Sequence, residues 1–219
     1  FTEAGKQAAD AAAKGKGYDG PEARPLEERC LTGIGNPEGP PMMNTAFNAH
    51  YQIVQTRDHV AIHVEMNHDV RIIRLNDRKH IAANITPYMG DSVGWYEGDT
   101  LVVETTNLIP GTGVGSLMGG FVWSPQSRLT ERFTRVGKSE ILYEFKVEDP
   151  VYFKQAWRGE MPMRTAKGPI YEYACHEGNY SIANALTGAR EMARRAAAEP
   201  APAPAAATVA ATPAAAVAR

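Results

Sequence analysis

The chain has 219 residues, and its 23 Lys and Arg side chains against 25 Asp and Glu give a formal net charge of −2. Nearly balanced charge creates no general field that would attract nucleic acid or an anionic membrane, so we expect neither as a partner. A membrane-spanning helix needs roughly 18 or more consecutive apolar residues, and the sequence contains no such run. The length predicts one domain with tails.

The two cysteines, Cys30 and Cys175, lie far apart and outside any spacing typical of zinc ligands. We therefore predict no metal and no cofactor. The pair would form one disulfide in an oxidising compartment, or remain two buried thiols in a reducing one. The sequence starts at Phe1, as an exported protein does after its signal peptide is removed, although a truncated chain would start in the same way. We expect a periplasmic or extracellular protein.

Residues 1–46 are predicted to precede the main domain. An Ala-rich patch within residues 1–18 predicts a short helix, and it lacks a wide apolar stripe. The prolines and glycines of residues 19–44 predict an extended arm, because this composition does not sustain regular structure. Cys30 lies within that arm, where a disulfide would fasten it to the domain.

Alternating apolar and polar residues dominate the chain from residue 47 to about residue 165. Alternation with period two is typical of half-buried β-strands, and Gly98 with Asp99 is typical of a hairpin turn. The glycine-rich residues 109–120 are predicted to form a mobile connection or a lid. The predicted strands cover residues 51–56, 59–66, 69–75, 93–97, 100–107, 128–136, 140–148 and 151–157.

This succession predicts a mainly β domain over residues 47–197, built as an antiparallel up-and-down meander. A meander must hide its edge strands, and closing into a lipocalin-like barrel removes them while leaving room for one small ligand. The alternative is an open twisted sheet or a sandwich with the C-terminal helix across one face. That helix is predicted over residues 179–197, where apolar residues recur at helical spacing. The Ala- and Pro-rich residues 198–219 are predicted to be a flexible tail, or one that becomes ordered on a partner.

The most concentrated set of reactive side chains lies in residues 171–180. His176 and Glu177 follow Cys175 at a strand-to-helix boundary, where a histidine can exchange protons and helix N–H groups can hold an anion. The structural alternative is that Cys175 fastens the N-terminal arm, while His176, Glu177 and Asn179 only satisfy turn and cap hydrogen bonds.

Three carboxylates, Glu65, Glu104 and Glu131, lie within alternating strands. Facing a barrel lumen, they would be buried and usable as general acids or bases; facing outward, they would be ordinary solubilising charges. Asn67 and His68 lie in a polar turn between two strands, which forms either capping hydrogen bonds or the rim of a pocket.

Five segments resemble a family of exported bacterial proteins usually labelled hypothetical: residues 51–56 (YQIVQT), 65–71 (EMNHDVR), 97–107 (EGDTLVVETTN), 131–135 (ERFTR) and 171–180 (YEYACHEGNY). The resemblance covers residues 25–190. It implies export from a Gram-negative-type bacterium, and it places Cys30 and Cys175 in shared motifs, which favours the disulfide. It implies no particular activity.

Two hypotheses on function follow. The first is a periplasmic or secreted barrel that binds a small, partly apolar ligand, with acid/base chemistry as an extension. The second is a non-catalytic accessory subunit of a larger periplasmic or membrane-associated assembly, which contacts neighbouring subunits through its N-terminal arm and C-terminal tail. A secreted hydrolase ranks third, with only isolated carboxylates in its favour. For the first hypothesis, the predicted catalytic residues are His176, Glu177, His68 and Glu104, and the predicted ligand-binding residues are Glu65, Asn67, Trp95, Glu131, Trp157 and Asn179, with Trp123 as a further apolar wall.

Overall fold

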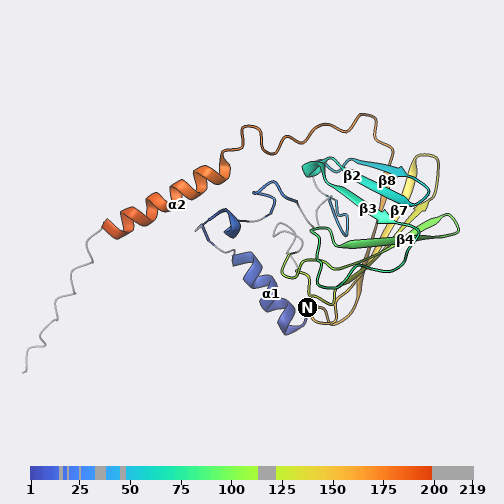
Figure 1. Ribbon diagram of the computed structural model, residues 1–219, viewed down its shortest axis with the longest axis horizontal. Helices are drawn as coiled ribbons and strands as arrows, with labels where there is room; N and C mark the ends of the chain where they lie inside the picture. The colour runs from blue at the N-terminus through green and yellow to red at the C-terminus, as the bar shows by residue number, and fades with distance from the viewer. Residues whose placement is uncertain are drawn as a thin grey trace, which may run out of the picture.

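Eight strands form one sheet in the computed structural model, which describes residues 1–14, 17, 18, 20–24, 26–32, 38–44, 48–112 and 122–198. The strands are hydrogen-bonded in chain order, and the sheet curls into a half-barrel (Figure 1). They are β1 (Tyr51–Gln55), β2 (His59–Val64), β3 (Val70–Arg74), β4 (Asp91–Glu97), β5 (Thr100–Thr106), β6 (Arg128–Arg135), β7 (Glu140–Glu148) and β8 (Trp157–Arg164). The mainly β prediction is confirmed. β1 and β8 end the strand order without pairing to each other, so the predicted lipocalin-like closed barrel is not confirmed.

Two α-helices flank the sheet in sequence, α1 (Glu3–Lys14) and α2 (Ser181–Ala198). Two short 3₁₀ helices, η1 (Pro21–Ala23) and η2 (Met66–His68), lie in the connections. In Figure 1, α1 lies beside the body, whereas α2 projects away from it. Both helices were predicted from the sequence. The predicted tail beyond residue 198 and residues 113–120 of the predicted glycine-rich loop lie outside the described residues.

The predicted strand boundaries fall within two residues of those observed for seven strands, and β7 agrees at both ends. The last prediction is wrong, because residues 151–156 form turns and bends and β8 starts only at Trp157. The cause is the buried carboxylate of Asp149, whose Oδ1 accepts hydrogen bonds of 3.0 Å from the backbone N–H groups of both Val151 and Tyr152. This side-chain acceptor turns the chain where the alternating sequence alone predicts a strand.

One strand pair departs from the predicted antiparallel meander. β3 and β4 are parallel, with Ile73 opposite Ser92 and Arg74 opposite Val93, whereas the other six pairs are antiparallel. A parallel pair cannot be joined by a tight hairpin and needs a long crossover connection. Residues 75–90 supply this crossover without a strand or a helix of their own.

The inner face of the curled sheet is filled with side chains. Trp123, Leu129, Tyr143 and Val147 have no exposed surface, and each belongs to one apolar cluster with residues from β2, β3, β5, β6 and β7. Alternation explains the composition of this face, because every second residue of a strand points inward. The core therefore occupies the space in which the sequence predicted a ligand.

A buried polar network crosses this apolar core. The guanidinium of Arg71 on β3 donates to both carboxylate oxygens of Glu131 on β6, with Nη1 3.0 Å from Oε1, and its Nε donates to Ser92 at 3.2 Å. The Ser92 hydroxyl is 2.8 Å from that of Thr105 on β5, and the Tyr143 hydroxyl on β7 donates to Glu131 at 2.7 Å. One network thus joins β3 to β7 across the intervening strands, and its two charges compensate each other.

Tyr143 also connects the N-terminal arm to the core. Its hydroxyl oxygen accepts a 3.0 Å hydrogen bond from the backbone N–H of Met42, which is itself buried. Burial, and then the adjacent Glu131 carboxylate, hold the pKa of the Tyr143 phenol well above its ordinary value. The phenol therefore keeps its proton and remains a donor to Glu131.

We predict that Glu131→Gln lowers the free energy of unfolding by about 3–5 kcal/mol, because it leaves the Arg71 charge buried without its counter-ion. Urea denaturation followed by circular dichroism would measure this change. The control is Glu160→Gln on β8, whose side chain is exposed and whose substitution should stay within about 0.5 kcal/mol. Equal stability of the two variants would contradict a structural role for the buried pair.

Candidate functional site

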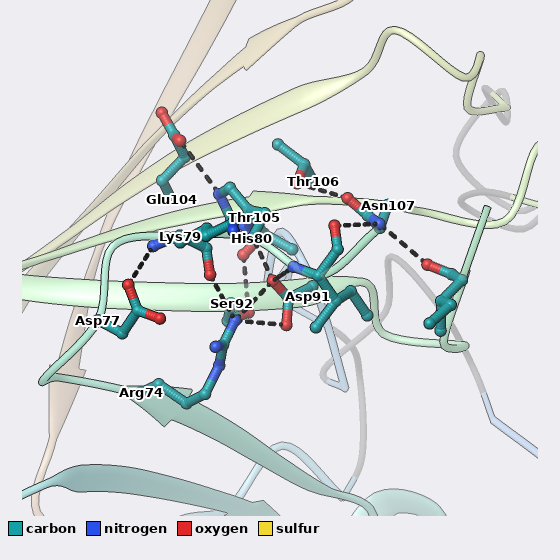
Figure 2. Close-up of polar contacts among 12 residues, drawn as sticks. Arg74, Asp77, Lys79, His80, Asp91, Ser92, Glu104, Thr105, Thr106 and Asn107 are labelled. Atoms are coloured by element: carbon teal, nitrogen blue, oxygen red, sulfur yellow. Dashed lines mark hydrogen bonds and ion pairs between the residues drawn. The ribbon is translucent and has the colours of Figure 1, made fainter. Parts of the chain in front are cut away.

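A chain of ionisable side chains fastens the crossover to the sheet (Figure 2). His80, in the crossover, lies between two carboxylates: its Nδ1 is 2.7 Å from Asp91 on β4, and its Nε2 is 3.1 Å from Glu104 on β5. Each carboxylate also binds an arginine, Asp91 to Arg74 at 2.8 Å and Glu104 to Arg128 at 2.9 Å. Two acidic groups thus face two arginines and an imidazole.

The strand register explains how these residues meet. Glu104 on β5 lies opposite Val93, two residues after Asp91, and Val93 in turn lies opposite Arg74 in the parallel pair. Alternation puts Glu104 on the outer face, since its neighbour Val103 is in the core. The cluster is therefore on the side of the sheet opposite the Arg71 network.

Both nitrogens of the His80 ring are engaged. Nδ1 is engaged by Asp91 and Nε2 by Glu104, so the two carboxylates hold the ring from both sides. The His80 side chain is 18% exposed, but a substrate would have to displace one carboxylate to reach a ring nitrogen. As it stands, the arrangement is better suited to holding the crossover in place than to accepting a proton from a substrate.

A second contact fastens the same crossover. Asn107, which follows β5, adopts a left-handed backbone conformation with φ of 59°. Its side-chain amide donates to the backbone carbonyls of Ile81, Ala82 and Ile85 at 3.4, 3.0 and 2.9 Å. Figure 2 shows Asn107 beside the His80 cluster, so both anchors act on one segment.

Trp95 lies on the outer face and not in a lumen. Its indole N–H donates to Glu97 at 3.0 Å, and the guanidinium of Arg78 lies over its ring at 4.2 Å from the centroid. Arg78 belongs to the crossover, so this cation–π contact adds a third attachment of that segment. The predicted role of Trp95 as a wall of an internal pocket is thus not supported by its position.

Glu65, which follows β2, binds two segments without regular structure, one before β1 and one after β8. Its carboxylate accepts hydrogen bonds from the backbone N–H of Tyr171 at 2.9 Å and from the Asn48 side chain at 2.8 Å, and His50 lies 3.5 Å away. The Tyr171 N–H, with smaller contributions from Asn48 and His50, lowers the pKa of Glu65 against the opposing effect of burial. The carboxylate is therefore ionised in the folded protein, and its position is not that of a general acid.

Asn67 and His68 follow Glu65 in the turn after β2, and we call these three residues the rim. The buried Asn67, with a left-handed φ of 52°, donates to the buried Glu38 carboxylate at 2.8 Å. The Nδ1 of His68 is 3.3 Å from the carbonyl oxygen of Tyr173. Both side chains thus connect the turn after β2 to segments far away in the sequence.

The disulfide between Cys30 and Cys175 is present, closing a separation of 145 residues. Asn179 lies against it, donating from its amide to Cys30 Sγ at 3.3 Å and accepting a 3.1 Å bond from the Ser181 N–H at the start of α2. One residue thus joins the bridge to the helix. A hollow of about 110 Å³ lies here, lined by Glu28, Arg29, Cys30, His176, Asn179 and Ile182.

The predicted site residues do not converge. His176 and Asn179 line the hollow beside the disulfide, where Glu177 is exposed and does not contribute to the lining. Glu131 is inside the core, as are Trp123 and the partly buried Trp157, whose ring packs edge-on against Phe145 at 5.5 Å. The residues are divided among four places: the disulfide junction (His176, Glu177, Asn179), the rim (Glu65, Asn67, His68), the core (Glu131, Trp123, Trp157) and the outer face (Glu104, Trp95).

His80, Asp91, Arg74 and Arg128 were not predicted from the sequence, and of the five residues only Glu104 was a candidate. Arg74 reaches Asp91 through the parallel pairing of β3 and β4, which an alternating pattern does not reveal. Within the described part of the chain, no group of three or more His, Cys, Asp or Glu side chains is arranged to hold a metal ion.

The chain matches no protein-family model, no curated protein and no solved structure. None of the helices in the described residues is both long and apolar enough to span a bilayer.

We predict that acid weakens the rim through Glu65. Because its pKa is lower in the folded than in the unfolded chain, its stabilising contribution is complete above the ordinary glutamate pKa of about 4.3 and is lost as the pH falls through the folded value. Unfolding free energies measured at a series of acidic pH values should fall more steeply for the natural chain than for Glu65→Gln. Parallel curves would show that Glu65 does not contribute in this way.

We predict that removing the disulfide destabilises the protein. For a loop of 145 residues, the chain-entropy estimate is about 5 kcal/mol, and measured effects are often smaller. A double Cys30→Ser, Cys175→Ser variant should melt at a lower temperature, and a reductant should lower the melting temperature of the natural chain but not of the variant. An unchanged melting temperature on reduction would show that the bridge does not stabilise the fold.

Proposed function

We propose that this is an exported, non-catalytic accessory protein that presents a rigid sheet and a projecting helix to neighbouring protein subunits. The observation that carries the proposal is the use of the candidate catalytic side chains. Of the predicted catalytic residues, Glu104 and His68 each bind a connecting segment or its anchor; of the predicted ligand-binding carboxylates, Glu65 binds a connecting segment and Glu131 is paired with Arg71 inside the core. Export is supported by the disulfide, since such bonds persist in oxidising compartments.

The projecting helix α2 supports contact with other subunits. Leu186 is its one buried residue, and residues 192–198 are exposed. Met192 is 72% exposed, and Figure 1 shows this end of α2 well away from the sheet. Asn179 connects the start of the helix to the disulfide.

The ligand-binding hypothesis has weaker support. A lipocalin-like closed barrel would require pairing of β8 with β1 and an internal space where the core now lies. The hollow beside His176 has about 110 Å³, whereas pockets for small organic ligands usually have roughly 300–1,000 Å³. That hollow has room for an ion or a few waters and not for a partly apolar ligand.

Native size in a cell extract tests the accessory role. We predict that the exported chain migrates in a larger complex in a periplasmic extract than after purification at the same concentration. Met192→Glu should reduce that complex without changing the melting temperature, because it places a charge on the exposed helix surface. The matched control is Val136→Glu, at a site 57% exposed in the β6–β7 turn. Equal sizes in extract and pure solution would contradict the proposal.

A further inference from the structure

The hollow beside the disulfide is lined mainly by side chains that donate hydrogen bonds. It has a volume of about 110 Å³, and one water molecule occupies roughly 30 Å³, so it has room for a small ion. Three of its lining residues are exposed, so it opens to solvent. The lining residues are Glu28, Arg29, Cys30, His176, Asn179 and Ile182.

The carboxylate in this lining is already paired. Both oxygens of Glu28 accept hydrogen bonds from the Arg24 guanidinium, each at 2.8 Å, so the two charges compensate each other. Glu27 and Glu177, which adjoin lining residues in the sequence, do not line the hollow. Among the described lining residues, therefore, none brings an unbalanced negative charge.

Arg29 brings a positive charge that no described carboxylate balances. Its side chain is partly buried, and within the described ranges it forms no ion pair and no side-chain hydrogen bond. The imidazole of His176 has no such partner in that part of the chain either. A guanidinium carries five N–H donors in a planar fork that matches an oxyanion, and an imidazole carries at least one N–H.

Asn179 adds a third donor, and its orientation is fixed. Its Oδ1 accepts a 3.1 Å hydrogen bond from the Ser181 N–H, and its Nδ2 donates to Cys30 Sγ, a lining atom, at 3.3 Å. The amide has a second N–H hydrogen, which binds no other described residue. Because the Ser181 N–H at the start of α2 is already used, side chains and not the helix end form the donor set.

We propose that this hollow binds a phosphate group, held by Arg29, His176 and Asn179. Three donor side chains around one small hollow match an ion whose oxygens all accept hydrogen bonds, and the bound anion neutralises the Arg29 charge. The hollow opens to solvent, so it accepts free phosphate or the phosphate end of a larger molecule. This inference does not depend on the proposed accessory role, because it concerns the purified chain alone.

Isothermal titration calorimetry with inorganic phosphate tests the site, with sodium chloride holding the ionic strength constant. The natural chain should bind at one saturable site. Arg29→Gln should weaken binding at least about tenfold, because it removes a charged hydrogen-bond donor. The matched control is Arg158→Gln, which makes the same change in charge at an exposed position on β8 and should bind like the natural chain.

Two further titrations refine the assignment. His176→Ala should also weaken phosphate binding, whereas His59→Ala, at an exposed position on β2, should not. Glycerol 3-phosphate, a phosphate monoester, replaces inorganic phosphate in the second titration. Binding of either compound supports the inference, and the tighter of the two shows whether the site takes a free ion or the end group of a larger molecule.

Nuclear magnetic resonance of the natural chain tests the same site without a substitution, so it decides even if a variant fails to fold. The Arg29 Nε–H and Asn179 side-chain amide signals should shift on addition of phosphate and saturate together, while the Arg158 Nε–H signal stays in place. The inference is overturned if neither phosphate compound binds saturably, if the folded Arg29→Gln chain binds as tightly as the natural one, or if sodium chloride alone produces the same shifts.

Discussion

The ion pair between Arg71 and Glu131 is the contact on which the shape of the sheet depends. It joins β3 to β6 across two intervening strands, so the sheet must curl to bring the two side chains together. Neither charge would be stable alone in the core, and Ser92 and Tyr143 provide further hydrogen bonds to the pair. Apolar burial supplies most of the driving force for folding, while this pair selects one curvature and also couples the N-terminal arm to the core through Tyr143 and Met42.

The connecting segments follow one structural principle. Three of the described connections are held by side chains that bind their backbone: Asn107 binds the crossover, Glu65 binds the segment after β8, and Asp149 shapes the turn before β8. Such bonds satisfy backbone groups that no strand pairs. They also explain why polar residues are concentrated in motifs that suggest a reactive site in the sequence. The carboxylate and amide side chains that bind backbone groups in this molecule are residue types that also occur in active sites.

Strand positions and faces could be predicted because a half-buried strand imposes a period of two, as Leu129, Glu131 and Phe133 show. The inward direction of Glu131 was foreseen as one of two alternatives, but its partner Arg71 was not, since pairing between distant residues depends on curvature. The parallel pair was missed for a similar reason: residues 69–75 and 93–97 read as ordinary strands whichever way they pair. The cluster around His80 joins the crossover to three strands, and its contact between Arg74 and Asp91 spans that pair, so it could not be assembled from local patterns. Whether the sheet closes into a barrel depends on whether β1 pairs with β8, and the alternation of apolar and polar residues within each strand does not determine that pairing.

The pairing between β3 and β4 extends over only two residue pairs. It is a narrow seam between β1–β3 and the remaining strands, and a short ladder opens more easily than a long one. Arg71 and Glu131 lie on opposite sides of this seam, so separating the two parts of the sheet would also expose a buried ion pair. The two parts of the sheet are therefore joined by few backbone hydrogen bonds between β3 and β4, and by the buried ion pair between Arg71 and Glu131. Salt and solvent screen a buried pair poorly, and the two parts of the sheet should open as one cooperative unit, without an intermediate in which only the seam is broken.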